Sequence, residues 1–545
     1  MALKRYGASQ DTTIVNAYEP NLTTRGTGSN TGKADVVEVF SIYGRESSGS
    51  QGLSRFLMQF PINSISTDRS NNQIPASGSV TFYLRIFNAP HSKAVPENFT
   101  LVAQAVSQSW QEGVGLDLEA YKDLTDGGTG ANWMSASNSA YWTDVNGTVL
   151  AGGSYHTGST NADVDTEIHT FKQTFTTGLE DLEMDITPLV EQWIAGTYSN
   201  YGLGIKLSAS YEAYSSGSDD SVTSRVPGQL ALDSSDDTQS VIYNPSGSVT
   251  SYYTKRFFAS GSQFFFSRPI IEARWDSMVK DDRGDFMYSS SLAPASDNLN
   301  TLYLYNYIRG QLTDIPSVGT TGSVMVSIFS GNLSNTQPSG SKLILYDGTK
   351  NLTGGWVSTG IYSCSVSVTA AAASPNILYD VWHSGSHTDE HVTHAQEFFT
   401  GSIEASFLSA SQTVSTPVYY MNLTNLQPRY MADQVARFNL YVRNKNWDPT
   451  VYTVSNTTPP TTTIHSASYK VYRIMDGKDV VSYGTGSELH TGLSFDVSGN
   501  YFDFDMSMLQ PGYAYAFKFA FYDAALRSWT EQPYTFKFRV EDYEY

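Results

Sequence analysis

The chain has 545 residues and a formal net charge of −20, from 33 Lys and Arg against 53 Asp and Glu. This excess of negative charge repels phosphate backbones and argues against direct binding to nucleic acid, which draws mainly on clustered Lys and Arg. A single cysteine, Cys364, excludes an intrachain disulfide and a thiolate zinc cluster.

The composition favours β-strands over helices. Aromatic residues make up 13% of the chain and charged residues only 16%, and there are 43 Gly and 20 Pro. Pleated, half-buried strands joined by tight turns suit such a mixture. The length exceeds what one hydrophobic core usually supports, so several domains are expected. Because no window approaches about 18 consecutive apolar residues, we expect neither a signal peptide nor insertion into a membrane.

Strand-like runs follow one another from the start of the chain. The alternation in "TFYLRIF" places Phe82, Leu84 and Ile86 on one face, as in a strand that covers a core on one side. The run "RPIIEARW" at 268–275 has the pattern of a closing strand. We therefore predict a first domain over residues 1–278.

One short helix is predicted among these strands, within "DITPLVEQWIAGTYSNYGLGIKL". Thr187 is the predicted N-cap, Pro188 occupies the first helical position, and Gly196 ends the helix about two turns later. Apolar residues at three- and four-residue spacing, Trp193 among them, give this helix one apolar face. The face must cover something, so we expect a single helix lying over a β core.

A charged, turn-rich stretch after residue 276 suits a connection between domains. It contains Arg283-Gly284-Asp285, a tripeptide that can serve in adhesion, but we favour a solvated linker here. Two further blocks of strand-like runs follow, at 279–415 and 416–545. In the second of them, "LQPGYAYAFKF" resembles the tyrosine corner of fibronectin type III and immunoglobulin-like sandwiches, with Tyr515 as the corner residue. Each block is predicted to be a smaller Ig-like β-sandwich.

Four of the nine histidines lie close together in "VWHSGSHTDEHVTHAQEF". Imidazoles with carboxylates between them can hold Zn²⁺ or a related ion, although the HExxH arrangement of a protease is absent. The Ser and Gly residues between them favour a solvated polar loop instead, and a metal site is the alternative. The candidate metal ligands are His383, His387, His391 and His394.

No pattern in the sequence supports catalysis. The stretch "GTGSNTGKAD" lacks the spacing of a phosphate-binding loop, and there is no G-x-S-x-G elbow. Cys364 lies in the alternating run "YSCSVSV", where a small half-buried side chain is expected. Carboxylate pairs arise without function in so acidic a chain. We predict a protein without enzymatic activity and without a cofactor.

Aromatic residues near an insertion at 120–150 are the candidate contact residues. Core packing is the expected role of Trp110, whereas Trp133, Tyr141 and Trp142 stand in polar surroundings. Loops on a rigid scaffold are common sites of interaction. We therefore predict that these three side chains contact a partner protein or a glycan.

The order of motifs over residues 8–276 resembles the DNRLRE-type β-sandwich. The motifs are "DTTIVNAYEPN", "LSRFLMQFPI", "IPASGSVTFYLRIFNA", "VSQSWQEGVG", "MDITPLVEQWIAGTYSNYGLGIKL" and "KRFFASGSQFFFSRPIIEARW". The resemblance implies a non-catalytic jelly-roll-like module, in which the short helix closes an open end of the sandwich and seats Trp193 on the core. The whole chain also resembles structural proteins of tailed bacteriophages in its serial β modules, few cysteines and net acidity.

These observations predict an all-β protein: an N-terminal jelly-roll-like β-sandwich with one short capping helix, followed by two smaller Ig-like β-sandwiches. The predicted role is a structural component of a tailed-phage virion, at the tail, neck or baseplate, made in the host cytoplasm. Its expected partners are other virion proteins and further copies of itself. The alternative is a glycan-binding adhesin that contacts the host surface, and a depolymerase is a third possibility.

Overall fold

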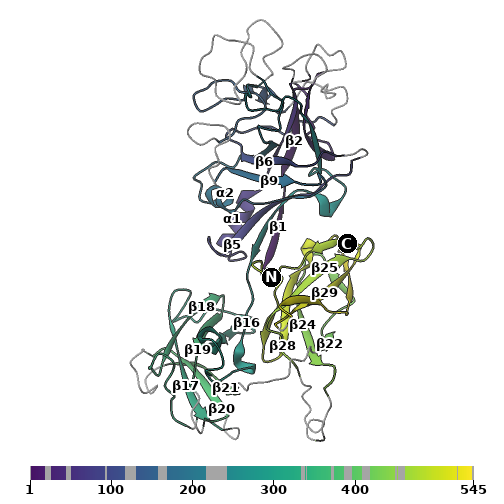
Figure 1. Cartoon of the computed structure of the whole chain (residues 1–545). Coiled ribbons are helices and arrows are strands. Elements are labelled where there is room, and N and C mark those ends of the chain that lie inside the picture. Colours follow the sequence, from purple (N-terminus) through teal and green to yellow (C-terminus); the bar gives the residue numbers. More distant parts are fainter. Residues whose placement is uncertain are drawn as a thin grey trace. The chain divides into compact units, whose positions relative to one another are not determined.

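The computed structural model gives an all-β protein whose chain divides into two compact units, Ala2–Asp276 and Ser277–Tyr545 (Figure 1). Within the residues that the structure describes, no helix is long and apolar enough to cross a membrane. The described residues are 2–18, 26, 28–43, 51–91, 95–116, 130–156, 168–215, 242–332, 338, 340–369, 374–385, 396–407, 418–447, 451, 461–524 and 526–542.

The first unit is a sandwich of two antiparallel sheets. The smaller sheet has the order β1 (Leu3–Gly7), β13 (Ile270–Trp275), β5 (Val80–Ile86) and β10 (Leu182–Asp185). The larger sheet has the order β12 (Tyr252–Phe258), β3 (Val36–Tyr43), β4 (Gln51–Gln59), β11 (Leu203–Leu207), β6 (Phe99–Ala105) and β9 (Thr170–Phe175), and β2 (Gln10–Val15) also pairs with β4.

A hydrophobic core fills the space between the two sheets. Phe82, Leu84 and Ile86 point into it from β5, as the alternation predicts. Leu203 and Ile205 of β11 belong to the same core from the other sheet. Because successive residues of a strand point to opposite faces, the residues between them face outward. The outer faces of both sheets are therefore available for polar contacts or for further cover.

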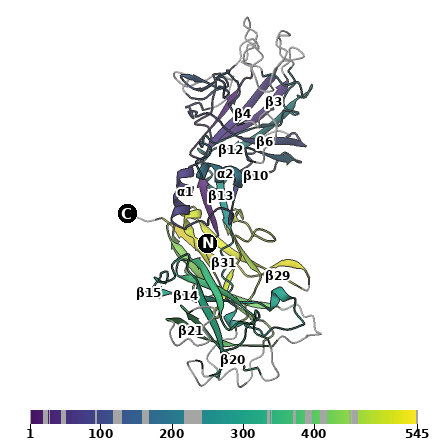
Figure 2. The ribbon, with the colours of Figure 1, turned by 90° about the vertical axis from the view of Figure 1, so that its left-hand side faces the viewer.

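The unit contains two helices within its described residues, so the prediction of a single helix is wrong. The helix α1 (Ile62–Ser70) is not predicted from the sequence, because "INSISTDRS" is polar and has no strong apolar face. Only Ile62 and Ile65 of this helix are buried. An ion pair between Arg69 and Glu191, at 2.6 Å, joins α1 to α2 (Thr187–Ile194), and the two helices lie side by side (Figures 1 and 2). Tertiary contacts stabilise this helix despite its low propensity.

The helix α2 packs Leu189, Val190 and Trp193 into the core. Gly196 follows it with φ of 72°, a left-handed conformation suited to glycine. The predicted capping by Thr187 is wrong, because the helix begins at Thr187 and its N-cap is Ile186, with Pro188 in the first turn.

Thr187 instead anchors the helix to β5. Its hydroxyl accepts a hydrogen bond from the Phe82 N–H at 2.8 Å and donates one to the Asp185 carboxylate at 2.6 Å. A hydroxyl engaged with a neighbouring strand does not satisfy the free N–H groups of its own helix, and this accounts for the failed prediction.

The second unit begins with a six-stranded antiparallel sheet. Its order is β14 (Asn300–Tyr305), β19 (Ile361–Val366), β18 (Leu352–Ser358), β17 (Val324–Gly331), β20 (Ile377–His383) and β21 (Glu397–Glu404). Tyr362, Cys364 and Trp382 lie in its core, and β20 is buried along its whole length. The sulfur of Cys364 is thus a buried apolar group, and burial raises the pKa of its thiol to about 12.

The second unit also contains a short hairpin of β15 (Tyr307–Ile308) and β16 (Gln311–Leu312) and two larger sheets. One has the order β22 (Tyr419–Leu423), β24 (Val435–Asn444), β28 (Gly499–Asp505) and β27 (Ser494–Asp496). The other has the order β23 (Arg429–Met431), β31 (Phe536–Glu541), β29 (Ala514–Asp523), β25 (Ala467–Arg473) and β26 (Asp479–Val481), and β30 (Ser528–Glu531) pairs with β29. Between them, the ring centres of Phe438, Phe502 and Phe517 lie 4.8 to 5.2 Å from one another. The buried Tyr515 donates its hydroxyl hydrogen to the Gln510 carbonyl at 2.7 Å, the contact that defines a tyrosine corner.

The start of the second unit is not a solvated linker. The main chain of Val279 and Asp281 exchanges hydrogen bonds with Phe495 of β27, at 2.9 and 3.0 Å. The Arg283 guanidinium is buried in an ion pair with Asp380 of β20 and donates to the Tyr303 carbonyl at 3.1 Å. Arg283 is therefore not available to bind a receptor. Neither interpretation of Arg283-Gly284-Asp285, as an adhesion motif or as part of a solvated linker, agrees with the structure.

Candidate functional site

Two of the three predicted aromatic contact residues are buried. Trp133 and Trp142 have no exposed surface, and the Trp142 indole N–H donates to the Asn132 carbonyl at 2.8 Å. The prediction that they contact a partner or a glycan is therefore wrong. Tyr141, on the short hairpin of β7 (Ser135–Ser137) and β8 (Ala140–Tyr141), is 60% exposed. Of the three residues, only Tyr141 can reach a ligand in this conformation.

The tryptophans are buried because the larger sheet has an apolar outer face. Leu53 and Leu57 of β4 point away from the main core and form a second core with Trp110, Trp133 and Trp142. Trp110, predicted to be a core residue, is indeed buried there. Segments inserted after β6 fold over this face, and their aromatic rings cover it. The insertion therefore serves the packing of the sheet.

A buried ion pair reinforces this second core. Arg55, between Leu53 and Leu57 on β4, binds Glu212 at 2.9 and 3.1 Å and donates to the Gly152 carbonyl at 3.0 Å. Its guanidinium lies 5.4 Å from the ring centre of Trp133. The carboxylate, a carbonyl and an aromatic face already bind the guanidinium, so it is not available to bind a substrate.

The predicted histidine site is not formed by His383. This residue is the last of β20, is buried, and uses both ring nitrogens: the Gly385 N–H donates to Nδ1 at 3.1 Å and Nε2 lies 2.9 Å from Ser327 Oγ. A metal ligand needs a free ring nitrogen, so the prediction is wrong for His383. The described residues contain no group of three or more His, Cys, Asp or Glu placed for a metal. His387, His391 and His394 lie outside the described residues.

Ser327 and His383 resemble a nucleophile with its base, but the hydrogen bond between them runs in the opposite direction. Since Nδ1 accepts from Gly385, the neutral ring carries its proton on Nε2 and donates it to Ser327 Oγ. Ser327 in turn donates to Asn351 Oδ1 at 2.7 Å, which also accepts from Lys342. A histidine that donates to the serine cannot take its proton, and Ser327 is fully buried. This cluster is a structural network.

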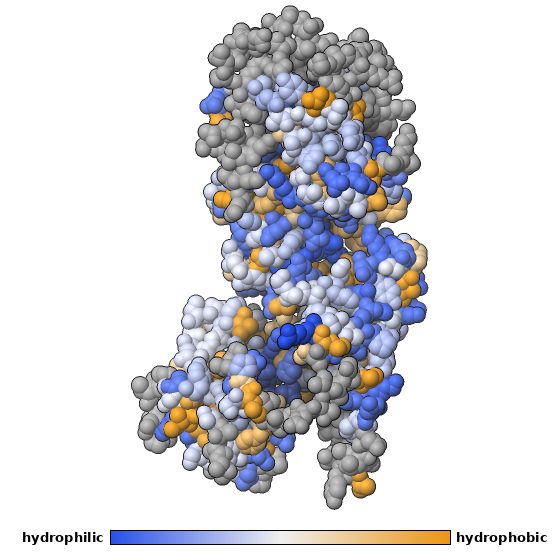
Figure 3. All heavy atoms as spheres, viewed as in Figure 1, coloured by the Kyte–Doolittle hydropathy of each residue, from blue (hydrophilic) through white to orange (hydrophobic). Residues whose placement is uncertain are grey.

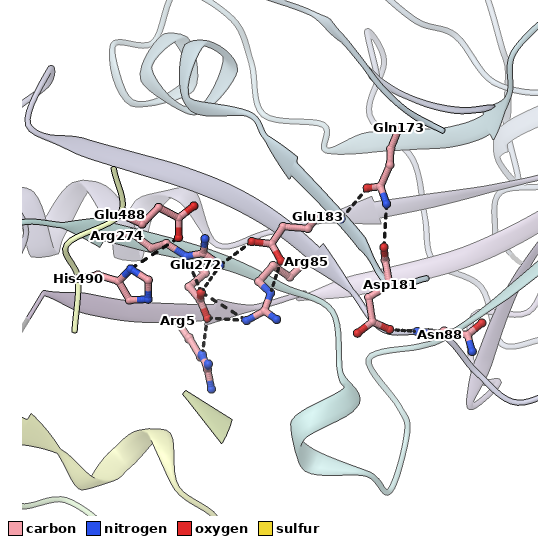
Figure 4. Close-up of polar contacts among 10 residues, drawn as sticks. All are labelled: Arg5, Arg85, Asn88, Gln173, Asp181, Glu183, Glu272, Arg274, Glu488 and His490. Atoms are coloured by element: carbon pink, nitrogen blue, oxygen red, sulfur yellow. Dashed lines mark hydrogen bonds and ion pairs between the residues drawn. The ribbon is translucent and has the colours of Figure 1, made fainter. Parts of the chain in front are cut away.

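A charged network covers the outer face of the smaller sheet (Figure 4). Glu272 of β13 binds Arg5 at 2.7 Å, Arg274 at 2.7 Å and Arg85 at 3.2 Å, and Arg274 also binds Glu183 at 2.7 Å. Burial alone would raise the pKa of Glu272, but the three guanidinium groups hold it well below its usual range. A carboxylate so firmly ionised cannot act as a general acid, and its oxygens are already occupied.

The candidate interaction site is an exposed cluster of phenylalanines between β12 and β13. We call Phe258, Phe264, Phe265 and Arg268 the Phe patch. Phe264 is 53% and Phe265 37% exposed; the rings of Phe258 and Phe264 are 5.3 Å apart, and the Arg268 guanidinium lies 6.0 Å from the Phe265 ring centre. Single exposed apolar residues are ordinary, and several are scattered over the face seen in Figure 3. Adjoining exposed aromatic rings mark an interaction surface.

The turn that carries the Phe patch is held firmly. The Ala259 N–H donates to the Asp35 carbonyl at 2.9 Å, and the Ser260 N–H donates to the Asp11 carboxylate at 2.6 Å. Arg268 donates to the Ser262 carbonyl at 2.8 Å. The rings are thus presented by an ordered turn, which lowers the entropic cost of binding. The sequence signal was the run "FFASGSQFFFSRP", in which aromatic residues flank a Gly/Ser turn.

Comparison with known proteins identifies no family. No family model matches the chain, and no curated protein matches it. Among solved structures, a marsupial T cell receptor is similar over 48% of this chain and 72% of its own, with 10% sequence identity and a TM-score of 0.15. A likeness of this size carries no argument about function.

Asp11, which holds the turn of the Phe patch, gives the first unit a specific pH dependence. Burial raises the pKa of Asp11 to about 6 from 3.8, against the lowering effect of the hydrogen bond from Ser260. Between about pH 4 and pH 6 the folded protein therefore binds more protons than the unfolded chain, and Asp11 makes stability fall as pH rises. We expect Asp11→Asn, which keeps an acceptor oxygen, to stabilise the unit by about 1 to 3 kcal/mol at pH 7.5.

The measurement is urea unfolding of the wild type and Asp11→Asn at pH 4 and pH 7.5. The two proteins should differ by no more than about 0.5 kcal/mol at pH 4, where the carboxyl group is protonated in the folded state and about half protonated in the unfolded chain. A variant that is less stable than the wild type at pH 7.5 would contradict the raised pKa of Asp11.

Proposed function

We propose that this protein is a structural component of a tailed-phage virion, at the tail, neck or baseplate, where its β-sandwich modules assemble with other virion proteins. The observation that carries the proposal is the contrast between two kinds of side chain. The reactive-looking groups are buried and engaged with one another, as in Ser327 with His383 and Glu272 with three arginines. The Phe patch, in contrast, exposes apolar rings on an ordered turn.

An assembly role suits a patch of this size. Phe264 and Phe265 together offer too little apolar area for a stable interface by themselves, because specific interfaces bury about 800 Å² on each partner. Virion proteins act in symmetric, repeated copies, and repetition multiplies a modest affinity. The resemblance of the whole chain to serial β-module proteins of tailed phages supports the same role.

Most of the residues predicted for the adhesin alternative cannot contact a glycan. A glycan site would need aromatic rings exposed for stacking, and two of the three predicted rings, Trp133 and Trp142, are buried. Tyr141 remains exposed, so glycan binding that depends on Tyr141 is the outcome that would favour the adhesin.

The test is the incorporation of a Phe264→Ser/Phe265→Ser variant into particles. We expect the variant to fold, because both rings are partly exposed and neither belongs to a core of the first unit. It should be incorporated at least about tenfold less than the wild type, since aromatic anchors dominate interface energy. Immunogold labelling and quantitative mass spectrometry of purified particles measure the incorporation.

The matched control is Tyr307→Ser, which removes an aromatic ring that is 58% exposed on the short strand β15 (Tyr307–Ile308). This variant should be incorporated like the wild type. Equal incorporation of the Phe264→Ser/Phe265→Ser variant would remove the Phe patch from the proposal, and wild-type particles without label would overturn the proposed function itself.

A further inference from the structure

Lys255 is a fully buried lysine at the edge of the first sandwich. It lies on β12, and its Nζ donates to Asn88 Oδ1 at 2.6 Å, to the Gly178 carbonyl at 2.8 Å and to the Glu180 carbonyl at 2.8 Å. Buried lysines are rare unless they are paired with a carboxylate. The oxygens bonded to Nζ belong to an amide side chain and two peptide groups, all of them neutral.

The surroundings of Lys255 make its proton easier to remove than that of an exposed lysine. The rings of Phe175 and Phe257 lie 5.1 and 5.0 Å from Nζ and exclude water from it. Burial lowers the pKa of Lys255 to about 8, against the charges of Asp181 and Glu180, which raise it. At pH 7 about a tenth of the Lys255 side chains are thus uncharged, far more than for an exposed lysine, and a neutral lysine amine is a nucleophile.

Asn88 is held beside this amine. It lies two residues after the end of β5, and its N–H donates to the Asp181 carboxylate at 2.7 Å (Figure 4). An isolated bridge pairs Asn88 with Phe257 of β12. Main-chain contacts on both sides therefore hold the amide group of Asn88 against Nζ. Two groups held in this way react as if each were present at a very high concentration, which raises the reaction rate.

We propose that Lys255 and Asn88 form an intramolecular amide cross-link. The lone pair of Nζ attacks Cγ of Asn88, a Cγ–Nζ bond forms, and the Cγ–Nδ2 bond breaks. The proton given up by Nζ passes to Nδ2, which leaves as ammonia, so that no oxidant, reductant or further reactant is needed. The product is a secondary amide between two side chains.

Glu180 is one of the two carboxylates whose charges act on Lys255. Its Oε1 accepts N–H bonds from Thr176 at 2.9 Å and Thr177 at 2.7 Å, and within the described residues its buried Oε2 has no hydrogen-bond partner. Its peptide carbonyl already binds Nζ. Burial raises the pKa of Glu180, but hydrogen bonds that include those from Thr177 and Thr176 lower it to about 2, so the carboxylate stays ionised. We assign to its Oε2 oxygen only the relay of the proton from Nζ to the leaving nitrogen.

The cross-link would join the two sheets of the sandwich. Asn88 continues β5 of the smaller sheet, and Lys255 belongs to β12 of the larger one. The chain has a single cysteine and cannot make such a bridge with an intrachain disulfide. A covalent link between sheets suits a module that is under mechanical tension, although the proposal does not depend on the virion role.

The test is the intact mass of the full-length protein under denaturing conditions. We expect the wild type to be lighter than its sequence mass by one ammonia, and a proteolytic digest to contain one peptide that joins the segments around Asn88 and Lys255. Asn88→Ala and Lys255→Met should each have their full mass. Asn88→Asp should lose water instead and reach the same final mass as the cross-linked wild type.

The wild-type measurement decides the question even if a variant fails to fold. A wild-type mass equal to the sequence mass would overturn the proposal and leave Lys255 as an ammonium held by three oxygens. Succinimide formation at Asn146-Gly147 also releases ammonia, so a loss that fragmentation maps to that dipeptide would overturn it as well. A loss of ammonia that persists in Lys255→Met would also overturn the proposal.

Discussion

Replacing Trp133 by alanine is expected to lower the free energy of unfolding of the first unit by about 3 to 5 kcal/mol. Trp133 is fully buried in the second core, against the outer face of β4 and beneath the Arg55 guanidinium. Truncation would leave a large cavity and remove the aromatic face from a buried cation. Urea unfolding at constant pH measures the loss.

Two further variants separate packing from contact. Trp142→Ala removes another buried ring of the same core and is expected to cost a similar amount. Tyr141→Ala, next to it in the chain but 60% exposed, should change stability by no more than about 0.5 kcal/mol. If Trp133→Ala keeps wild-type stability and loses binding to a partner or a glycan, the structural role of Trp133 is wrong.

The burial of these tryptophans could be inferred only from a distant strand. Around Trp133 and Trp142 the sequence is polar, and local composition predicts an exposed loop. The deciding signal lies in β4, where Leu53 and Leu57 alternate with Phe56 and Met58, so that both faces of the strand are apolar. A strand that is apolar on both faces must be covered on both sides. Which segment supplies the cover depends on the tertiary fold.

The β-sandwich could be predicted from the local alternation of apolar and polar residues. The period of two in β5 placed Phe82, Leu84 and Ile86 in the core, because the direction of a side chain in a strand is set by its position. The short helix α2 was equally clear from its apolar spacing. The helix α1 was missed since only Ile62 and Ile65 of it are buried, and its ion pair to Glu191 spans a long stretch of sequence.

The prediction for His383 as a metal ligand failed for a related reason. His383 ends a strand, Ile377–His383, in which every residue is buried, and the Ser and Gly residues after it suggested a loop one residue too early. The same strand buries Asp380, a charge that needs a partner. The partner, Arg283, lies almost a hundred positions earlier in a stretch with the composition of a linker, and no spacing rule connects the two.

Replacing Arg283 by leucine is expected to destabilise the second unit by about 3 to 5 kcal/mol, because it leaves the buried Asp380 carboxylate without its cation. Burial raises the pKa of Asp380, against Arg283, which lowers it. Without Arg283 the pKa of Asp380 rises further, and the folded protein binds a proton that the unfolded chain releases. The loss of stability should therefore be larger at pH 8 than at pH 5.

The double variant Arg283→Leu/Asp380→Asn tests whether charge is the cause. The amide that replaces Asp380 can still accept the Trp382 indole N–H, which lies 2.7 Å from the carboxylate in the wild type, and no buried charge remains. We expect the double variant to regain most of the stability lost by Arg283→Leu and to lose the extra pH dependence, because removing both partners of a buried pair is often nearly neutral.

Calorimetry measures these effects. It should show that Arg283→Leu shifts the unfolding transition of the second unit and that Trp133→Ala shifts that of the first. A double variant as unstable as the single one would assign the effect of Arg283 to its packing against Phe399, whose ring centre lies 5.1 Å from the guanidinium, and not to its charge.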